Sequence, residues 1–320
     1  MRKTDVAPLW NSPGCDYNAG FVVVKPSDIT RTLYRMIWSI TSQSTETDDQ
    51  RALNDAIEAL QSEKTSLRVT ELNERRFLSG YEYFQKPRRW FASNVDDRCS
   101  ERNYSDCAVV VHNNWIVSKA AKIYRFRENL MWYYDGNDQY YTSTTRCYLM
   151  YVNEALKNPE FIKKKRDVRV ASEISALKTA MIMGYLLDRT VILPKFRIGK
   201  DALEYPLNYF IHVKTFNGQF SGRYREHSFL RHPKVPDQVK SELHTQALVM
   251  TKVGNSGRGS VAVSRFEILR QFGKINASVL AISSPRDVNV VLGTGRGDVA
   301  FSRKLHRGFL RSKYKQGKRW

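Results

Sequence analysis

A helical segment that leads directly into a short apolar strand is the feature that most constrains the fold. From Glu173 to Leu187, apolar residues recur at intervals of three and four, which places them on one face of a helix. The run from Thr190 to Leu193 is typical of a short buried strand, and Pro194 ends it. Helices that alternate with strands in this way build α/β sheets. The sequence therefore predicts an α/β fold.

The first half of the chain shows elements of the same kinds. Residues 20–25 predict a short buried strand ended by Pro26, and Ser27 or Asp28 is the expected cap of a helix. A second helix is expected to begin near Asp48, where acidic residues favour the helix dipole. The expected apolar faces are Ile29, Leu33, Ile37 and Ile40 in the first helix, and Ala52, Leu53, Ala56, Ile57 and Leu60 in the second.

Residues 108–111 predict a further strand, which delivers His112 at its end. Ligands of α/β domains bind beyond the carboxyl ends of strands, so His112 is a candidate site residue. A basic amphipathic helix is expected from Lys119 to Trp132, and the pattern breaks at residues 135–138, where we place a domain boundary. Three parts follow: residues 1–135, a second α/β domain at 136–302, and a loosely ordered basic tail at 303–320.

The chain has 320 residues and a formal net charge of +20, which favours anionic partners such as nucleotide diphosphates, acidic glycans, membrane headgroups or nucleic acid. It contains no apolar run of about 18 residues that could cross a bilayer, and its first residues lack the apolar centre of a signal peptide.

Two N-glycosylation sequons begin at Asn103 and Asn276. The four cysteines show no zinc-binding spacing, which leaves disulfides, such as Cys99 with Cys107, or buried thiols.

Four groups of residues follow one another in order through the first half of the chain. They are Asn18–Pro26, Asp48–Gln50 with Asn54, Phe77–Gly80, and Val111–Trp115 with Lys122. Together they resemble the nucleotide-diphospho-sugar transferase domain of glycosyltransferase family 77, which includes plant wall xylosyl- and arabinosyltransferases. The resemblance covers roughly residues 10 to 135, and its specificity lies in the order and spacing of the segments.

The resemblance implies the C-terminal half of a GT-A, Rossmann-like domain, hence an incomplete GT-A domain followed by a second, smaller α/β domain. It implies transfer of a sugar from a nucleotide diphosphate sugar to a glycan or glycoprotein hydroxyl, with retention of configuration. Family members are typically Golgi membrane glycoproteins that hold a divalent metal, Mn²⁺ in most, on a D-x-D motif. That motif would lie upstream of Asn18, which only seventeen residues precede, and no D-x-D occurs in this chain. We therefore expect either a fragment or a degenerate relative.

The resemblance also implies roles for individual residues. His112 would be a late metal ligand beside the donor diphosphate, and Lys122 would neutralise the charge of the departing nucleoside diphosphate. Ser118 stands where the family has a glycine, which changes how closely the backbone approaches phosphate. Lys119 is a nearby substitute for Lys122, although an exposed helix position is the simpler interpretation of Lys119.

A carboxylate near the transferred sugar would come from Asp48 or Asp49, with Gln50 beside it, and we assign these three as catalytic candidates. Helix capping is the alternative for either aspartate. The remaining residues carried over from the family would bind donor or acceptor: Asn18 and Gly20 on the acceptor side, Gly80 in a loop at the sugar pocket, and Asn114. Turns are the alternative explanation for both glycines.

The second half resembles O-fucosyltransferase-like domains more faintly, through the phrase R-T-x-I-L-P at residues 189–194. Residues 225–228 (Arg-Glu-His-Ser) are compatible with an acid/base cluster, but we favour a charged loop because the sequence identifies no partner. The basic run 163–166 is interpreted as a solvated surface, and the glycine-rich segments 254–259 and 293–297 as loops.

Two other functions remain open at this point. A glycan-binding or scaffold protein without catalysis would keep the basic cleft but not the metal. A nucleic-acid binder is suggested by the net charge and by the tail, where Tyr314 and Trp320 lie among basic residues and could stack on bases. No recognised nucleic-acid-binding module is present, which disfavours that second alternative.

Overall fold

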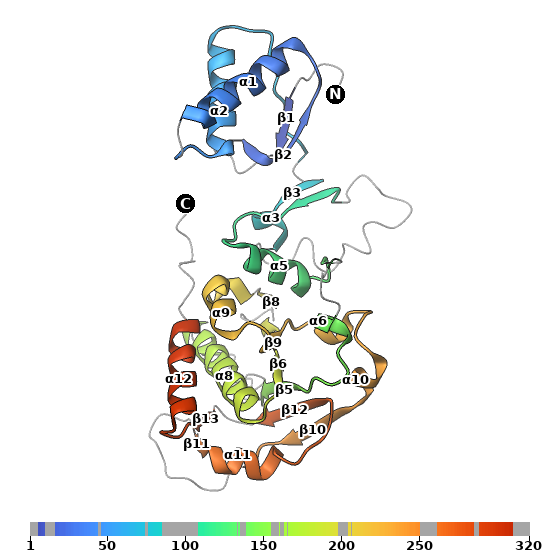
Figure 1. Cartoon of the computed structure of the whole chain (residues 1–320), viewed down its shortest axis with the longest axis vertical. Helices are drawn as coiled ribbons and strands as arrows, with labels where there is room; N and C mark the ends of the chain where they lie inside the picture. The colour runs from blue at the N-terminus through green and yellow to red at the C-terminus, as the bar shows by residue number, and fades with distance from the viewer. Residues whose placement is uncertain are drawn as a thin grey trace. The chain divides into compact units, whose positions relative to one another are not determined.

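The computed structural model describes the chain in segments, and its contacts divide the chain into two compact units, Met1–Ile116 and Val117–Trp320. Each unit is described on its own (Figure 1). The described elements confirm an α/β fold. The domain boundary predicted at residues 135–138 lies outside the described residues. Those residues are 6–9, 17–43, 46–73, 76–84, 108–132, 134, 139–154, 160, 163–164, 166–197, 204–205, 207–249, 261–284 and 288–309.

Unit 1 contains two helices packed on a pair of antiparallel strands. Helices α1 (Asp28–Gln43) and α2 (Asp49–Ser62) follow strand β2 (Asn18–Val24), which pairs with β1 (Val6–Leu9). Both predicted apolar faces are confirmed, because they meet in one core. The fully buried members of that core are Val6, Leu33, Leu53, Ala56, Ile57, Leu60 and Leu67.

Strand β2 is confirmed, but the expectation that it is fully buried is wrong. Most of its residues are only partly buried, because successive side chains of a strand point to opposite faces. Val22 and Val24 pack against the helical core, whereas the Phe21 ring stacks on Phe77 with the ring centroids 5.6 Å apart. This stacking joins β2 to the next part of the unit.

Two short parallel strands complete unit 1. Strand β3 (Phe77–Ser79) pairs with β4 (Val110–His112), and Ser79 lies opposite His112 in the register. Helix α3 (Gly80–Phe84) begins directly after β3, so the expectation that Gly80 lies in a loop is wrong. The carboxyl ends of β3 and β4 therefore meet at one edge, as the sequence predicts for His112.

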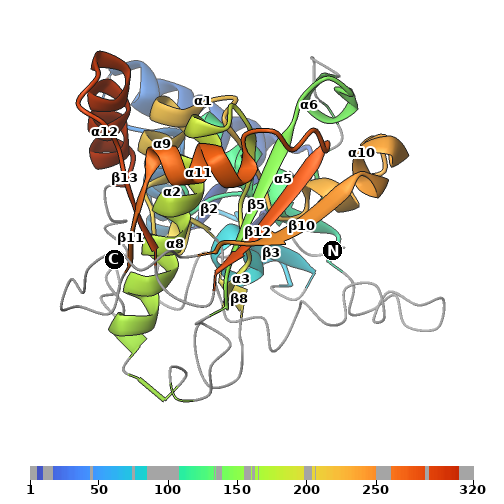
Figure 2. The same ribbon diagram turned by 90° about the horizontal axis from the view of Figure 1, so that it is seen from below.

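Unit 2 is built on a five-stranded, entirely parallel sheet. Its strands are β5 (Tyr148–Asn153), β6 (Thr190–Ile192), β9 (Tyr224–Arg225), β10 (Leu243–Ala247) and β12 (Val279–Ser284). They lie in the order β10-β12-β5-β6-β9, and Figure 2 shows β5, β12 and β10 side by side. The chain therefore adds β6 and β9 on one side of β5 before it adds β10 and β12 on the other side.

Helices surround this sheet and connect its strands. Helix α8 (Arg166–Leu186) lies across β5 and β6 and leads into β6, which confirms the predicted helix and strand pair. A second parallel pair, β11 (Val261–Ser264) with β13 (Val288–Val291), flanks α8. The other described elements are α5 (Lys119–Glu128), α6 (Gln139–Thr142), β7 (Phe196–Arg197), β8 (Glu204–Tyr205), η3 (Leu207–Tyr209), α9 (Val213–Phe220), η4 (Phe229–Arg231), α10 (Asp237–Ser241), α11 (Arg265–Phe272) and α12 (Arg296–Gly308).

Two predicted boundaries in unit 2 are wrong. The basic helix expected to reach Trp132 ends at Glu128, because Asn129 caps it and Leu130 adopts a φ of 56°. Residues 303–308, expected in a loose tail, belong to α12, whose Phe301 is buried against Phe220 with the ring centroids 6.0 Å apart. The buried ring of Phe301 therefore holds this basic helix on the core.

The buried side chain of Arg189 holds the amino-terminal edge of the sheet together. Its Nη1 donates to the carbonyl oxygens of Tyr148 (3.2 Å) and Ala277 (2.7 Å), and its Nη2 donates to that of Ile275 (2.6 Å). These carbonyls belong to the start of β5 and to the turn before β12. Arg189 itself precedes β6, so one cation joins three neighbouring strands.

Two glycines near the end of α9 allow a matched test of backbone conformation. Gly222 adopts a φ of 76°, and an added Cβ would meet no atom within 4 Å at either Gly222 or Gly218. We expect Gly222→Ala to destabilise the protein by about 1 kcal/mol or more, because its conformation strains any L-residue. Gly218→Ala, within the helix, should instead stabilise by about 0.5 to 1 kcal/mol.

The measurement is urea unfolding of both variants beside the wild type. Equal effects of the two substitutions would contradict the backbone assignment of Gly222.

Candidate functional site

The closest contact at the carboxyl edge of β4 is between His112 and Gly20. A Cβ placed on Gly20 would lie 2.2 Å from Cε1 and 2.3 Å from Nε2 of the His112 ring. The imidazole edge that bears Nε2 therefore lies directly on the Gly20 backbone, which no larger residue allows. Two of the predicted site residues, separated by most of unit 1 in sequence, are thus in contact.

Two asparagine side chains organise the backbone around this contact. Asn18 is buried, and its Oδ1 accepts a hydrogen bond from Gly20 N at 2.8 Å. Asn114 Oδ1 accepts a hydrogen bond from Gly80 N at 2.6 Å, which fixes the start of α3. Since Ser79 lies opposite His112, Gly80 and Asn114 flank the same edge. The structure brings together all five residues that the resemblance assigned to this part of the site in unit 1: Asn18, Gly20, Gly80, His112 and Asn114.

The start of α2 is connected to this edge through Asn54. Its Oδ1 accepts a hydrogen bond from Tyr17 N (2.7 Å), and its Nδ2 donates to the Tyr17 carbonyl (2.8 Å) and to the Gln50 carbonyl (2.7 Å). Tyr17 immediately precedes Asn18. The helix is thereby held next to the strand that carries the predicted acceptor-side residues.

The predicted catalytic group at residues 48–50 has a structural role at this helix. Asp48 is the N-cap of α2, and its Oδ1 accepts a hydrogen bond from Arg51 N at 2.8 Å. Asp49 lies in the first turn with an exposed side chain, and Gln50 is partly buried. Capping, the alternative for either aspartate, is therefore the observed role of Asp48, and Asp49 retains a solvent-exposed carboxylate.

Lys122 and Ser118 belong to unit 2. Ser118 is the N-cap of α5, where its Oγ accepts a hydrogen bond from Ala121 N at 3.3 Å, and Lys122 is exposed on the same helix. Ser118 adopts a φ of 89°, in the region that favours glycine. The family's glycine at this position thus matches the backbone of this chain, although the residue itself is a serine.

The residues around His112 do not make a complete metal site. Across the described segments, no group of three or more His, Cys, Asp and Glu side chains is placed to hold an ion. The neighbours of His112 named above are amide and backbone groups, which are weaker ligands for Mn²⁺ than carboxylates.

A buried cluster of charged and aromatic residues lies in unit 2, at residues that the sequence analysis interpreted as a charged loop. That interpretation is wrong, because Arg225, Glu226 and Ser228 are all almost completely buried. Glu226 accepts hydrogen bonds from the hydroxyls of Tyr140 (2.7 Å) and Tyr141 (3.3 Å). The partners that the sequence did not identify are these two tyrosines of α6.

Two guanidinium groups enclose the ring of Tyr140. The Cζ atoms of Arg127 and Arg225 lie 3.6 Å and 4.0 Å from its centroid, within the range of cation–π interactions. Burial raises the pKa of Glu226, although the hydrogen bond from Tyr140 and the two positive charges act in the opposite direction. Burial likewise raises the pKa of Tyr224 well above its usual range.

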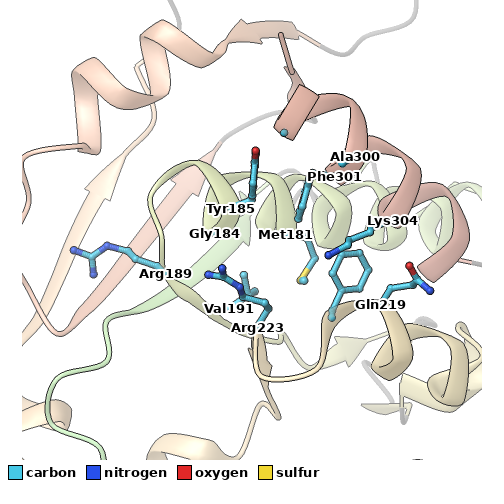
Figure 3. A pocket seen from close by; sticks show the side chains of 12 residues that line it. Met181, Gly184, Tyr185, Arg189, Val191, Gln219, Arg223, Ala300, Phe301 and Lys304 are labelled. Atoms are coloured by element: carbon cyan, nitrogen blue, oxygen red, sulfur yellow. The ribbon is translucent and has the colours of Figure 1, made fainter. Parts of the chain in front are cut away.

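A cavity of about 190 Å³ lies in unit 2 between α8, α9 and α12 (Figure 3). Met181, Val191 and Phe301 give it largely apolar walls, and Figure 3 shows the Arg189 side chain directed away from it. Tyr185 donates a hydrogen bond from its hydroxyl to Asp298 Oδ1 (3.2 Å) at its rim. We interpret this cavity as a packing space between helices.

Comparisons with known protein families, with curated proteins and with solved structures find no match to this chain. No helix within the described segments is long and apolar enough to span a membrane.

Cys147 is a free, partly buried thiol. The predicted pairing of Cys99 with Cys107 lies outside the described residues, as do Asn103 and residues 254–259.

The contact between Gly20 and His112 predicts strong coupling between the two positions. Gly20→Ala should destabilise the protein by about 1 to 3 kcal/mol, because the added methyl group overlaps the imidazole. In a His112→Ala background the same substitution should cost less, since the overlapping ring is absent and only the 2.9 Å approach to Asn18 Oδ1 remains. Urea unfolding of the wild type, both single variants and the double variant measures the coupling, and additive effects would refute the contact.

The buried carboxyl group of Glu226 predicts a pH-dependent stability. Because burial raises its pKa above the ordinary value of 4.5, the folded protein binds this proton more tightly than the unfolded chain. The stability of the wild type relative to Glu226→Gln should therefore increase as the pH falls from 8 to 5. The measurement is urea unfolding at several pH values.

Glu267 provides the control, because hydrogen bonds from Arg270 and Gln271 lower its pKa. The difference between the wild type and Glu267→Gln should be flat from pH 8 to 5. A flat difference for Glu226→Gln as well would contradict the assignment of a raised pKa.

Proposed function

We propose that the chain is a glycosyltransferase-family protein that transfers a sugar from a nucleotide diphosphate sugar to a hydroxyl of a glycan or glycoprotein. We further propose that unit 1 corresponds to the acceptor-side half of a GT-A domain, and that the protein acts in the Golgi. The observation that carries the proposal is the convergence of Asn18, Gly20, Gly80, His112 and Asn114 at one edge of unit 1.

This convergence supports the proposal because the five residues were selected from order and spacing alone. They come from three separate strands or strand ends, and their contacts are compatible with the resemblance. The carboxyl edge of a parallel strand pair is also where α/β domains bind their ligands. A set of unrelated surface residues would have no reason to share this edge.

The side chains at this edge suit the recognition of sugar hydroxyls. Amide groups and an imidazole supply both hydrogen-bond donors and acceptors, as each sugar hydroxyl requires. Asn18 and Asn114 are fixed by their own bonds to backbone N–H groups, so they hold the strand ends in place. His112 is held against Gly20 and presents a partly exposed ring to a ligand.

The exposed carboxylate of Asp49 is the group that we propose to face the transferred sugar. Its neighbour Asp48 is committed to the helix N-cap, which leaves Asp49 for hydrogen bonds to hydroxyls or for balancing positive charge on the sugar ring. Asn54 keeps the start of α2 next to Tyr17 and therefore next to the His112 edge. The role of Lys122 at the donor diphosphate stays a prediction from the resemblance.

Nucleotide-sugar turnover by the purified full chain tests this proposal. A panel of nucleotide diphosphate sugars is incubated with and without Mn²⁺, and the released nucleoside diphosphate is measured. We expect His112→Ala to lower turnover at least tenfold, which corresponds to about 1.4 kcal/mol of transition-state stabilisation. The matched control is His244→Ala, because His244 is exposed on β10 of unit 2.

Failure of every donor to bind or react would overturn the proposal, as would full activity of His112→Ala. Glycan binding without turnover would instead favour the non-catalytic alternative. Tight RNA or DNA binding that weakens steeply with salt would favour the nucleic-acid alternative.

A further inference from the structure

A polar cavity of about 270 Å³ lies in unit 2 at the amino-terminal edge of the parallel sheet. Arg146 and Gly222 precede β5 and β9, and Arg225 lies within the short strand β9. Tyr124 and Arg127 of α5 and Tyr140 of α6 complete the principal lining. The nucleotide-sugar site proposed for unit 1 lies at the carboxyl edge of its strands, where ligands of α/β domains bind. This cavity lies at the opposite edge of another sheet, so it is a different site.

Three guanidinium groups line this cavity, and none of the described residues that line it is acidic. Arg127 and Arg225 both pack against the Tyr140 ring, with their Cζ atoms 3.6 Å and 4.0 Å from its centroid. Glu226 accepts a hydrogen bond from the Tyr140 hydroxyl at 2.7 Å. The cluster therefore carries more positive than negative charge at the cavity, which favours an anionic ligand.

The charged group that decides the nature of this site is Arg225, which is only 2% exposed. Its Nε donates to the Tyr140 carbonyl (3.3 Å) and its Nη1 to the Tyr224 carbonyl (2.9 Å). Its Nη2 has no acceptor among the residues that the structure describes. Nη2 is not among the side-chain atoms that are shut off from solvent without a partner, so a ligand or a water in the cavity can provide its acceptor.

Arg146 provides a second donor group at the mouth of the cavity. Its Nη1 bonds to Thr190 Oγ1 (3.3 Å) and to the Gly222 carbonyl (3.1 Å), which orients the planar guanidinium. Within the described segments, Nε and Nη2 of Arg146 make no hydrogen bond, so these donors are available to a ligand. Oriented guanidinium groups that surround a small space match the tetrahedral oxygens of a phosphate group.

We propose that this cavity of unit 2 binds the phosphate group of a small phosphorylated ligand through Arg146 and Arg225, with Arg127 and Tyr140 as rigid support. The volume is close to the lower limit of ligand sites, about 300 Å³, and suits a sugar phosphate or free phosphate rather than a dinucleotide. The phenol hydroxyls of Tyr124 and Tyr224 add polar groups for the remainder of the ligand. The site lies entirely in unit 2, so it does not depend on the function proposed for unit 1.

Calorimetric titration of the full chain with inorganic phosphate, pyrophosphate and a hexose phosphate tests the proposal. We expect saturable binding of a phosphate compound that weakens at least tenfold in Arg146→Gln, and at least tenfold in Arg225→Lys, since lysine cannot form the forked contact. Arg146 is exposed, so its variant should fold even if the variant of the buried Arg225 does not. Tighter binding of the hexose phosphate than of inorganic phosphate would identify a phosphorylated sugar as the ligand.

Two controls isolate the site. Arg303→Gln removes the same charge from an exposed position on α12 and should bind phosphate within twofold of the wild type. His244→Ala, at an exposed position on β10, should also bind phosphate normally. Absence of saturable binding by the folded wild type, or equal affinity of Arg146→Gln and Arg303→Gln, would overturn the proposal.

Discussion

The parallel sheet of unit 2 depends on one buried cation, the guanidinium of Arg189. Parallel strands have no hairpins to join them, so their relative positions are set by what covers and connects their ends. Arg189 meets this need by donating to the carbonyl oxygens of Tyr148, Ala277 and Ile275. Burial lowers its pKa, but an arginine stays charged inside a protein, and charged hydrogen bonds are the stronger ones. The central strand β5 and its neighbours are aligned by this contact.

The two candidate sites use different physical means to hold a ligand. The edge of unit 1 has amide and imidazole groups fixed by close backbone packing, as in the contact between Gly20 and His112. The cavity of unit 2 has cations held by aromatic packing around Tyr140. Part of the chain's large positive charge is therefore placed in an ordered interior position rather than spread over the surface.

Local patterns in the sequence predicted the elements well, because helix faces and short strands are encoded by neighbouring residues. The apolar faces of α1 and α2, the pair of α8 and β6, and the position of His112 at a strand end were all predicted. The cluster around Glu226 was not, because its partners in α5 and α6 are far away in sequence and burial of a charged residue has no local signal. From sequence alone, residues 225–227 fit both an exposed charged loop and a buried cluster. The contacts of Tyr140 and Tyr141 with Glu226 decide between the two.

The order of the strands also determines when the sheet of unit 2 can form during synthesis. Tyr148 of the central strand β5 pairs with Val279 of β12, so one edge of β5 waits for most of the second half of the chain. At ribosomal rates this delay is on the order of ten seconds. During this delay β5 exposes unpaired backbone groups and apolar side chains, and such an edge can pair with strands of other chains. Until the last strands emerge, an unpaired edge of this kind favours aggregation over folding.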